Sequence, residues 1–159
     1  MSKLHSPASQ RSSRAEADAT LDGMSIPPTV IRRLNPARLA APRGYSHVVE
    51  VSGGGRTIYV SGQVSVDETG AVVGAGDLRA QARKVFENLQ AALEAAGASF
   101  ANVVKLTFYV LDASQIQVIR DVRETFLEKD AAPASTLVEV RRLAREEFLL
   151  EVEAIAHVD

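Results

Sequence analysis

Residues 103–111 constrain the fold most, because this predicted β-strand carries large apolar side chains on both of its faces. One face holds Val104, Leu106, Phe108 and Val110, and the other holds Val103, Thr107, Tyr109 and Leu111. A strand of this kind lies inside a sheet, or is covered by a helix on one side and by another subunit on the other. The chain therefore needs a sheet with both faces covered.

The segments around this strand predict an α+β architecture. A helix is expected from the cap Asp77 to Gly97, and a second helix from the cap Ser114 to about Phe126, because apolar residues recur there at steps of three and four. The other predicted strands cover residues 47–51, 56–62, 136–143 and 149–158. The glycines at 53–55 predict a hairpin between the first two of these strands. This order favours one mixed sheet with two helices on one face.

The sheet face away from the helices predicts an oligomer. Tyr59 and Tyr109 would lie on it together with several aliphatic residues. An apolar patch of that size on a monomer usually marks an interface.

The chain ends in a domain and begins in a segment of different composition. The first 25 residues are rich in Ser, Ala and charge and contain few large aliphatic residues. Such a segment buries too little surface to offset its ordering entropy. We expect a disordered tail over residues 1–30 and a single domain over residues 31–159, which is an ordinary size for one domain.

Composition argues against several classes of function. The 18 Lys and Arg residues against 20 Asp and Glu residues give a net charge of −2, so neither nucleic acid nor an anionic membrane is an expected partner. There is no cysteine, and the three histidines lie far apart, so we expect no metal site. The absence of cysteine also fits a cytoplasmic location, and no apolar run has the length of a membrane span. The basic cluster Arg141, Arg142 and Arg145 is interpreted as a solvated edge.

Several segments in order along the chain resemble one known family. They include Tyr59-Val60-Ser61-Gly62-Gln63, Pro133-Ala134-Ser135-Thr136-Leu137 and Leu150-Glu151-Val152-Glu153-Ala154. Over residues 43–158 the chain resembles the RidA/YjgF family of enamine and imine deaminases. The resemblance implies a chorismate-mutase-like subunit, a homotrimeric barrel and a small-molecule cleft between subunits. It also implies hydrolysis of 2-imino acids to 2-keto acids and ammonia without a cofactor.

The same resemblance implies roles for individual residues. Glu151 matches the glutamate that activates water, Tyr45 a tyrosine of the cleft, and Ser61 and Gly62 a strand of the pocket; Leu137 is expected to contact substrate. From the residues alone, alternatives stay open. Glu151 is also compatible with a charge at the sheet edge, and Tyr45 with a core or interface aromatic residue.

Two positions depart from the family pattern. Ser135 stands where the family has the arginine that binds the substrate carboxylate, and a hydroxyl offers neither the charge nor the forked geometry of a guanidinium. Arg120 stands where the family commonly has asparagine; it is either a displaced carboxylate ligand or a solvent-facing helical residue. We therefore expect 2-iminopropionate to be hydrolysed far more weakly than by relatives with the arginine.

Three functions follow as hypotheses. The first is a deaminase-like hydrolase that acts on a small reactive imine or enamine. The second is a trimer that binds or senses a small molecule without catalysis. The third, an endoribonuclease, fits least well, because the chain is acidic, has few aromatic residues and shows no basic stripe.

Overall fold

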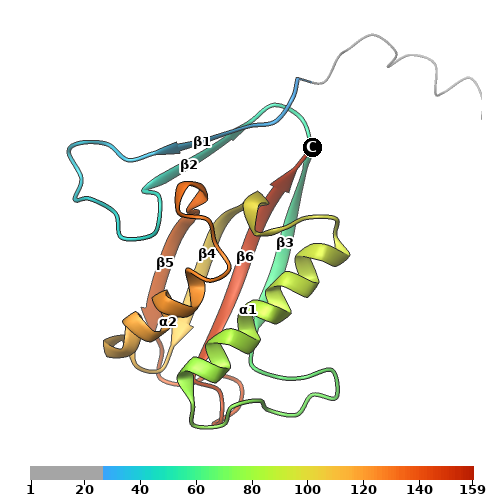
Figure 1. The fold of residues 1–159 in the computed structure, drawn as a ribbon, viewed down its shortest axis with the longest axis vertical. Helices are drawn as coiled ribbons and strands as arrows, with labels where there is room; N and C mark the ends of the chain where they lie inside the picture. Colours follow the sequence, from blue (N-terminus) through green and yellow to red (C-terminus); the bar gives the residue numbers. More distant parts are fainter. Residues whose placement is uncertain (1–26) are drawn as a thin grey trace, which may run out of the picture.

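A four-stranded mixed sheet with two helices on one face forms the body of the protein (Figure 1). The computed structural model describes residues 27–159. The strands follow the order β3 (Arg56–Gln63), β6 (Leu150–Val158), β4 (Val103–Val110) and β5 (Ala134–Glu139). Only the β4–β5 pair is parallel, and α2 (Ile116–Arg123) connects these two strands. The predicted α+β layout, with α1 (Leu78–Ala95) beside α2, is confirmed.

The predicted boundaries of the first helix are confirmed. The Asp77 carboxylate accepts hydrogen bonds from the backbone N–H groups of Arg79 and Ala80, both at 3.0 Å. Gly97, with φ of +68°, follows the last turn in the left-handed conformation that glycine tolerates best. The buried residues of α1 include Phe86 and Leu93.

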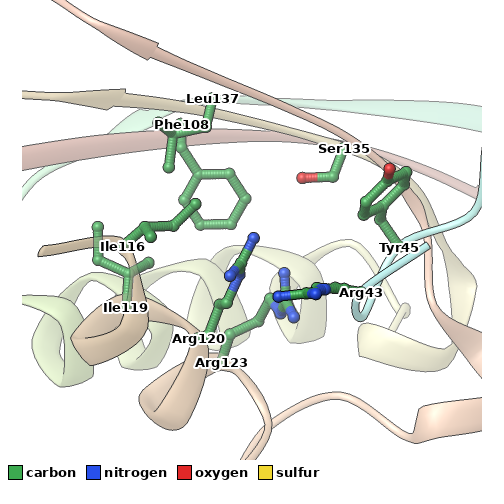
Figure 2. A pocket seen from close by; sticks show the side chains of 9 residues that line it. All are labelled: Arg43, Tyr45, Phe108, Ile116, Ile119, Arg120, Arg123, Ser135 and Leu137. Atoms are coloured by element: carbon green, nitrogen blue, oxygen red, sulfur yellow. The ribbon is translucent and has the colours of Figure 1, made fainter. Parts of the chain in front are cut away.

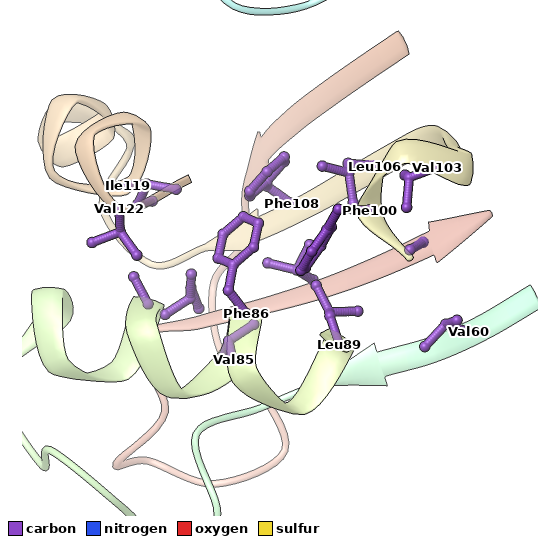
Figure 3. Close-up of a cluster of buried hydrophobic side chains, with 14 of the residues drawn as sticks. Val60, Val85, Phe86, Leu89, Phe100, Val103, Leu106, Phe108, Ile119 and Val122 are labelled. Carbon is purple, nitrogen blue, oxygen red and sulfur yellow. The ribbon is translucent and has the colours of Figure 1, made fainter. Parts of the chain in front are cut away.

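A group of phenylalanines fills the space between the helices and the sheet (Figure 3). The ring of Phe86 on α1 lies with its centroid 5.3 Å from that of Phe126, 5.8 Å from that of Phe100 and 6.3 Å from that of Phe108. Phe100 belongs to the short 3-10 helix η1 (Phe100–Asn102) that precedes β4. Rings at these separations contribute both burial and favourable aromatic contacts. They hold β4 and the chain after α2 against α1.

Gln81 is a buried polar residue with all its partners in place. Its amide nitrogen donates to the carbonyl oxygens of Glu147 at 2.7 Å and Gly74 at 3.2 Å, and its amide oxygen accepts from the N–H of Leu149 at 2.9 Å. These hydrogen bonds fix the position of α1 relative to residues 147–149, because a shift of either segment would leave a buried polar group without a partner. Gln81 thus sets where β6 begins.

The predicted hairpin between the first two strands is wrong. β2 (Val48–Ser52) pairs antiparallel with β1 (Val30–Leu34) in a separate two-stranded sheet, whereas β3 pairs with β6. Gly53 has φ of +101° and lies against the backbone of Pro28. A Cβ at position 53 would lie 2.2 Å from the carbonyl oxygen of Pro28. β1 has no clear signal in the sequence, because it is short and flanked by prolines.

Three smaller expectations are also corrected. Asp112, not Ser114, caps the turn that leads into α2, since its carboxylate accepts from the N–H of Ser114 at 2.9 Å. β5 runs from Ala134 to Glu139 and so ends before the basic cluster. A bulge at the start of β4 places Val103, rather than Val104, on the buried face.

The sequence predicts an N-terminal tail over residues 1–30. Most of the predicted tail, residues 1–26, lies outside the described residues, and β1 begins at Val30, the last residue assigned to that tail. Within residues 27–159 the helices fall short of what crossing a membrane requires in length and apolar character.

Candidate functional site

A cavity of about 120 Å³ lies between α2, β5 and the loop that joins β1 to β2 (Figure 2). It brings together four residues that the sequence analysis assigned to substrate binding from three separate segments: Tyr45, Arg120, Ser135 and Leu137. Phe108, Ile116 and Ile119 form an apolar wall beside them. The cavity thus combines polar groups with an apolar surface, as small-molecule sites usually do.

The register of the sheet explains why Ser135 and Leu137 reach this cavity. Ser135 lies opposite Leu106 and Leu137 lies opposite Phe108 in the parallel β4–β5 pair. Leu106 and Phe108 are buried on the helix side of the sheet. Residues opposite one another on paired strands share a face, so Ser135 and Leu137 also face the helices.

Tyr45 reaches the cavity because the loop around it is fastened to the start of β5. The N–H of Ser46 donates to the carbonyl oxygen of Pro133 at 2.9 Å, and its hydroxyl donates to that of Ala132 at 2.7 Å. Ser46 is buried, so both bonds are shielded from water. The two segments are almost ninety residues apart in the sequence, so no local sequence pattern predicts this contact.

Two arginines that the sequence analysis did not assign also line the cavity. Arg43 comes from the same loop as Tyr45, and Arg123 lies one turn of α2 beyond Arg120. The spacing of Arg120 and Arg123 was a usable signal, because residues three apart share a helix face. Burial lowers the pKa of the Arg123 guanidinium; the carboxylate of Glu124 opposes this shift, and the charge of Arg120 adds to it.

Glu151, Ser61 and Gly62 lie elsewhere. Glu151 is opposite Tyr109 in the β4–β6 pair, on the sheet face away from the helices. Gly62 lies directly beneath its carboxylate, since a Cβ on Gly62 would be 1.9 Å from Oε1 of Glu151. Ser61 is exposed at the same end of β3. The chain therefore separates the predicted residues into two groups on opposite faces of its sheet.

The face that carries Glu151 combines polar and apolar groups. The hydroxyl of Tyr109 donates to Oε1 of Glu153 at 3.3 Å, and desolvation together with this carboxylate raises the pKa of Tyr109. Tyr59 is 78% exposed and Val138 40% exposed. Among residues 27–159 no three acidic or histidine side chains converge in a way that would hold a metal ion.

The sequence model of the family described as "Endoribonuclease L-PSP" matches residues 35–158. A RutC family protein of Pyrococcus abyssi is 40% identical over 114 residues, which is 71% of this chain and 85% of that protein. A Salmonella typhimurium protein named 2-iminobutanoate/2-iminopropanoate deaminase is 41% identical over 105 residues, covering 64% of this chain and 80% of that protein.

Solved structures show the same fold. The Rid family protein YyfB of Yersinia pestis, described as a protein of unknown function, superposes with a TM-score of 0.73 at 36% identity over 80% of this chain and 98% of that chain. RidA from the Antarctic bacterium Psychrobacter superposes with a TM-score of 0.61, also at 36% identity, over 75% of this chain and 92% of that chain. The chain therefore belongs to the RidA/YjgF family, which its matching sequence model describes as endoribonuclease L-PSP.

Proposed function

We propose that the protein is a deaminase-like hydrolase of a small anionic imine, acting at a cleft between subunits of a homotrimer. The observation that carries the proposal is the division of the site residues into two half-sites. Half-site one is the cavity with Tyr45, Arg120, Ser135 and Leu137, and half-site two is Glu151 with Gly62 and Ser61. A symmetric ring places one face of each subunit against a different face of the next, and so can join them.

Each half-site supplies one part of the chemistry. The guanidinium of Arg120 holds the substrate carboxylate, and the apolar wall around Phe108 contacts its carbon chain. The carboxylate of Glu151 accepts a proton from water as the water oxygen bonds to the imine carbon. Glu151 returns this proton to the nitrogen, which gives a carbinolamine with an amino group. The proton of the carbinolamine hydroxyl then passes to the amino nitrogen, the carbon–nitrogen bond breaks, and the products are a 2-keto acid and ammonia. Water is the only co-reactant.

The name of the Salmonella relative supports this reaction, since that protein is called an imine deaminase. The exposed Tyr59 and Val138 support an assembly that covers the outer sheet face. A cavity of about 120 Å³ in a chain of net charge −2 does not suit RNA. A non-catalytic binding trimer is the second candidate, favoured by Ser135, a neutral hydroxyl that lines the cavity at the position where the family has its carboxylate-binding arginine.

Gly62→Ala tests whether the position of the Glu151 carboxylate matters. The new methyl group displaces the end of a flexible side chain, and the backbone of Gly62 does not require a positive φ, so the trimer should fold with a melting temperature close to that of the wild type. We expect kcat to fall by up to about 10²-fold, because small displacements of a reacting group are costly. Steady-state kinetics beside a thermal melt measure both effects. Unchanged kcat would argue against half-site two.

Mixed trimers test whether the two half-sites meet across an interface. We expect Arg120→Gln and Glu151→Gln trimers each to be nearly inactive. In trimers formed at random from both variants, about a quarter of the clefts should combine an intact half-site from each subunit, and activity should recover to about a quarter of the wild-type value.

The matched control mixes Glu151→Gln with Gly62→Ala. Both changes affect half-site two, so no cleft becomes intact and activity should stay low. Light scattering should return a mass near three chains for every preparation. A monomer, or no recovery in the Arg120→Gln and Glu151→Gln mixture, would overturn the inter-subunit site.

A further inference from the structure

The cavity has an unusual excess of positive charge. Three of its nine lining residues are arginines, Arg43, Arg120 and Arg123, and none is acidic. Figure 2 shows the three side chains gathered on one side of the cavity, across from Phe108 and Ser135. Among residues 27–159, neither Arg43 nor Arg120 forms an ion pair. Arg123 lies 3.9 Å from the carboxylate of Glu124, which is more than half exposed.

Arg123 is buried without a hydrogen-bond acceptor. Its side chain is 8% exposed, and one terminal nitrogen, Nη2, has no hydrogen-bond partner within the described part of the chain. A buried guanidinium without an acceptor is costly, since it has lost water without replacement. An anion in the cavity would offset the charge of this guanidinium.

The backbone is shaped to admit this guanidinium. Gly44 has φ of +73°, and a Cβ on it would lie 2.0 Å from Nη2 of Arg123. A side chain at position 44 would therefore push the guanidinium out of its place. The loop that carries Arg43 and Tyr45 thus also makes room for Arg123, which indicates a built site and not a chance cluster.

We propose that Arg43, Arg120 and Arg123 bind a small dianion, so that the substrate of this protein carries a second acidic group besides one carboxylate. A single carboxylate pairs in a bidentate manner with one guanidinium and leaves two positive charges close together. A second carboxylate, or the second charge of a phosphate group, offsets the remaining repulsion. This inference rests on the proposed function, because it names the substrate class of the same cavity.

The size of the cavity limits the dianion. A cavity of about 120 Å³ is small, which suits a short dicarboxylate or a phosphate group. The apolar wall of Phe108, Ile116, Ile119 and Leu137 accommodates a short carbon chain. The hydroxyls of Tyr45 and Ser135 add neutral hydrogen-bond donors.

Titration calorimetry on the full-length wild-type protein tests the inference with three probes: succinate, inorganic phosphate and propionate. We expect at least one dianion to bind at least about tenfold more tightly than propionate, because it pairs with more guanidinium groups. Tighter binding of succinate identifies a dicarboxylate, and tighter binding of phosphate identifies a phosphate ester. Equal affinity for propionate and both dianions, or no binding of either dianion, overturns the inference.

Variants locate the binding. Arg120→Gln should weaken dianion binding about tenfold or more, whereas Arg83→Gln, which removes an exposed arginine of α1 outside the cavity, should leave it unchanged. Arg123→Met should abolish the rise in melting temperature that the dianion produces in the wild type. If Arg123→Met does not fold, the comparison of Arg120→Gln with Arg83→Gln still shows whether the dianion binds in the cavity. An equal loss in both of these variants would place the dianion elsewhere.

Failure of this inference and failure of the proposed function are distinguishable. If the protein binds a dianion but hydrolyses no imine, the three-arginine site is supported and the hydrolase function is contradicted. If the protein hydrolyses 2-iminopropionate efficiently and shows no preference for dianions, the hydrolase function is supported and dianion binding by the three arginines is contradicted.

Discussion

Glu151→Gln should lower kcat for imine hydrolysis by about 10²- to 10⁴-fold, the usual contribution of a general base. The amide keeps the shape of the side chain above Gly62 but cannot accept the proton of the attacking water. KM should change little, because the cations that hold the substrate lie in the other half-site. The measurement is ammonia release from an imine generated in the assay, with a thermal melt as the test of folding.

Glu153→Gln is the matched control for this change. Glu153 lies two residues further along the same face of β6 and accepts a hydrogen bond from Tyr109. The amide oxygen of glutamine can still accept that bond, so kcat should stay close to the wild-type value. If Glu151→Gln retains full activity, or if both variants lose it equally, Glu151 is not the base.

Exchanging Arg120 and Ser135 for the residues common in the family should produce the second large effect. In the Arg120→Asn, Ser135→Arg double variant, we expect kcat/KM for 2-iminopropionate to rise about 10²-fold over the wild type, because the bidentate contact to the carboxylate then comes from β5, where the family has it, and no longer from Arg120 on α2. Ser135 already faces the cavity from β5, so the new guanidinium enters it. Removing Arg120 makes space and removes one like charge.

Two comparisons make this result interpretable. Ser135→Arg alone should gain less, since it places four guanidinium groups around a cavity of about 120 Å³. Adding Glu151→Gln to the double variant should abolish the gain. If the double variant forms a trimer yet hydrolyses no 2-iminopropionate, the non-catalytic binding function is favoured instead.

Most of the fold could be predicted from the sequence, because its signals are local. The cap Asp77 and the spacing of apolar residues define α1, and the alternation along β6 defines which side chains face the helices. The β1–β2 pair could not be predicted in this way. Its partners are joined by thirteen loop residues, and Val30–Leu34 has too few residues for a clear period.

The candidate site depended more on tertiary structure. The sequence and its resemblance to a family identified Tyr45, Arg120, Ser135 and Leu137, but only the folded chain shows that they line one cavity while Glu151 lies across the sheet. Arg43 enters through the docking of Ser46 on residues 132–134, a contact between distant segments. The apolar periods that identify helices and strands depend on residues close together in the sequence. The charge of a cavity depends on side chains from distant segments, which come together only when the chain has folded.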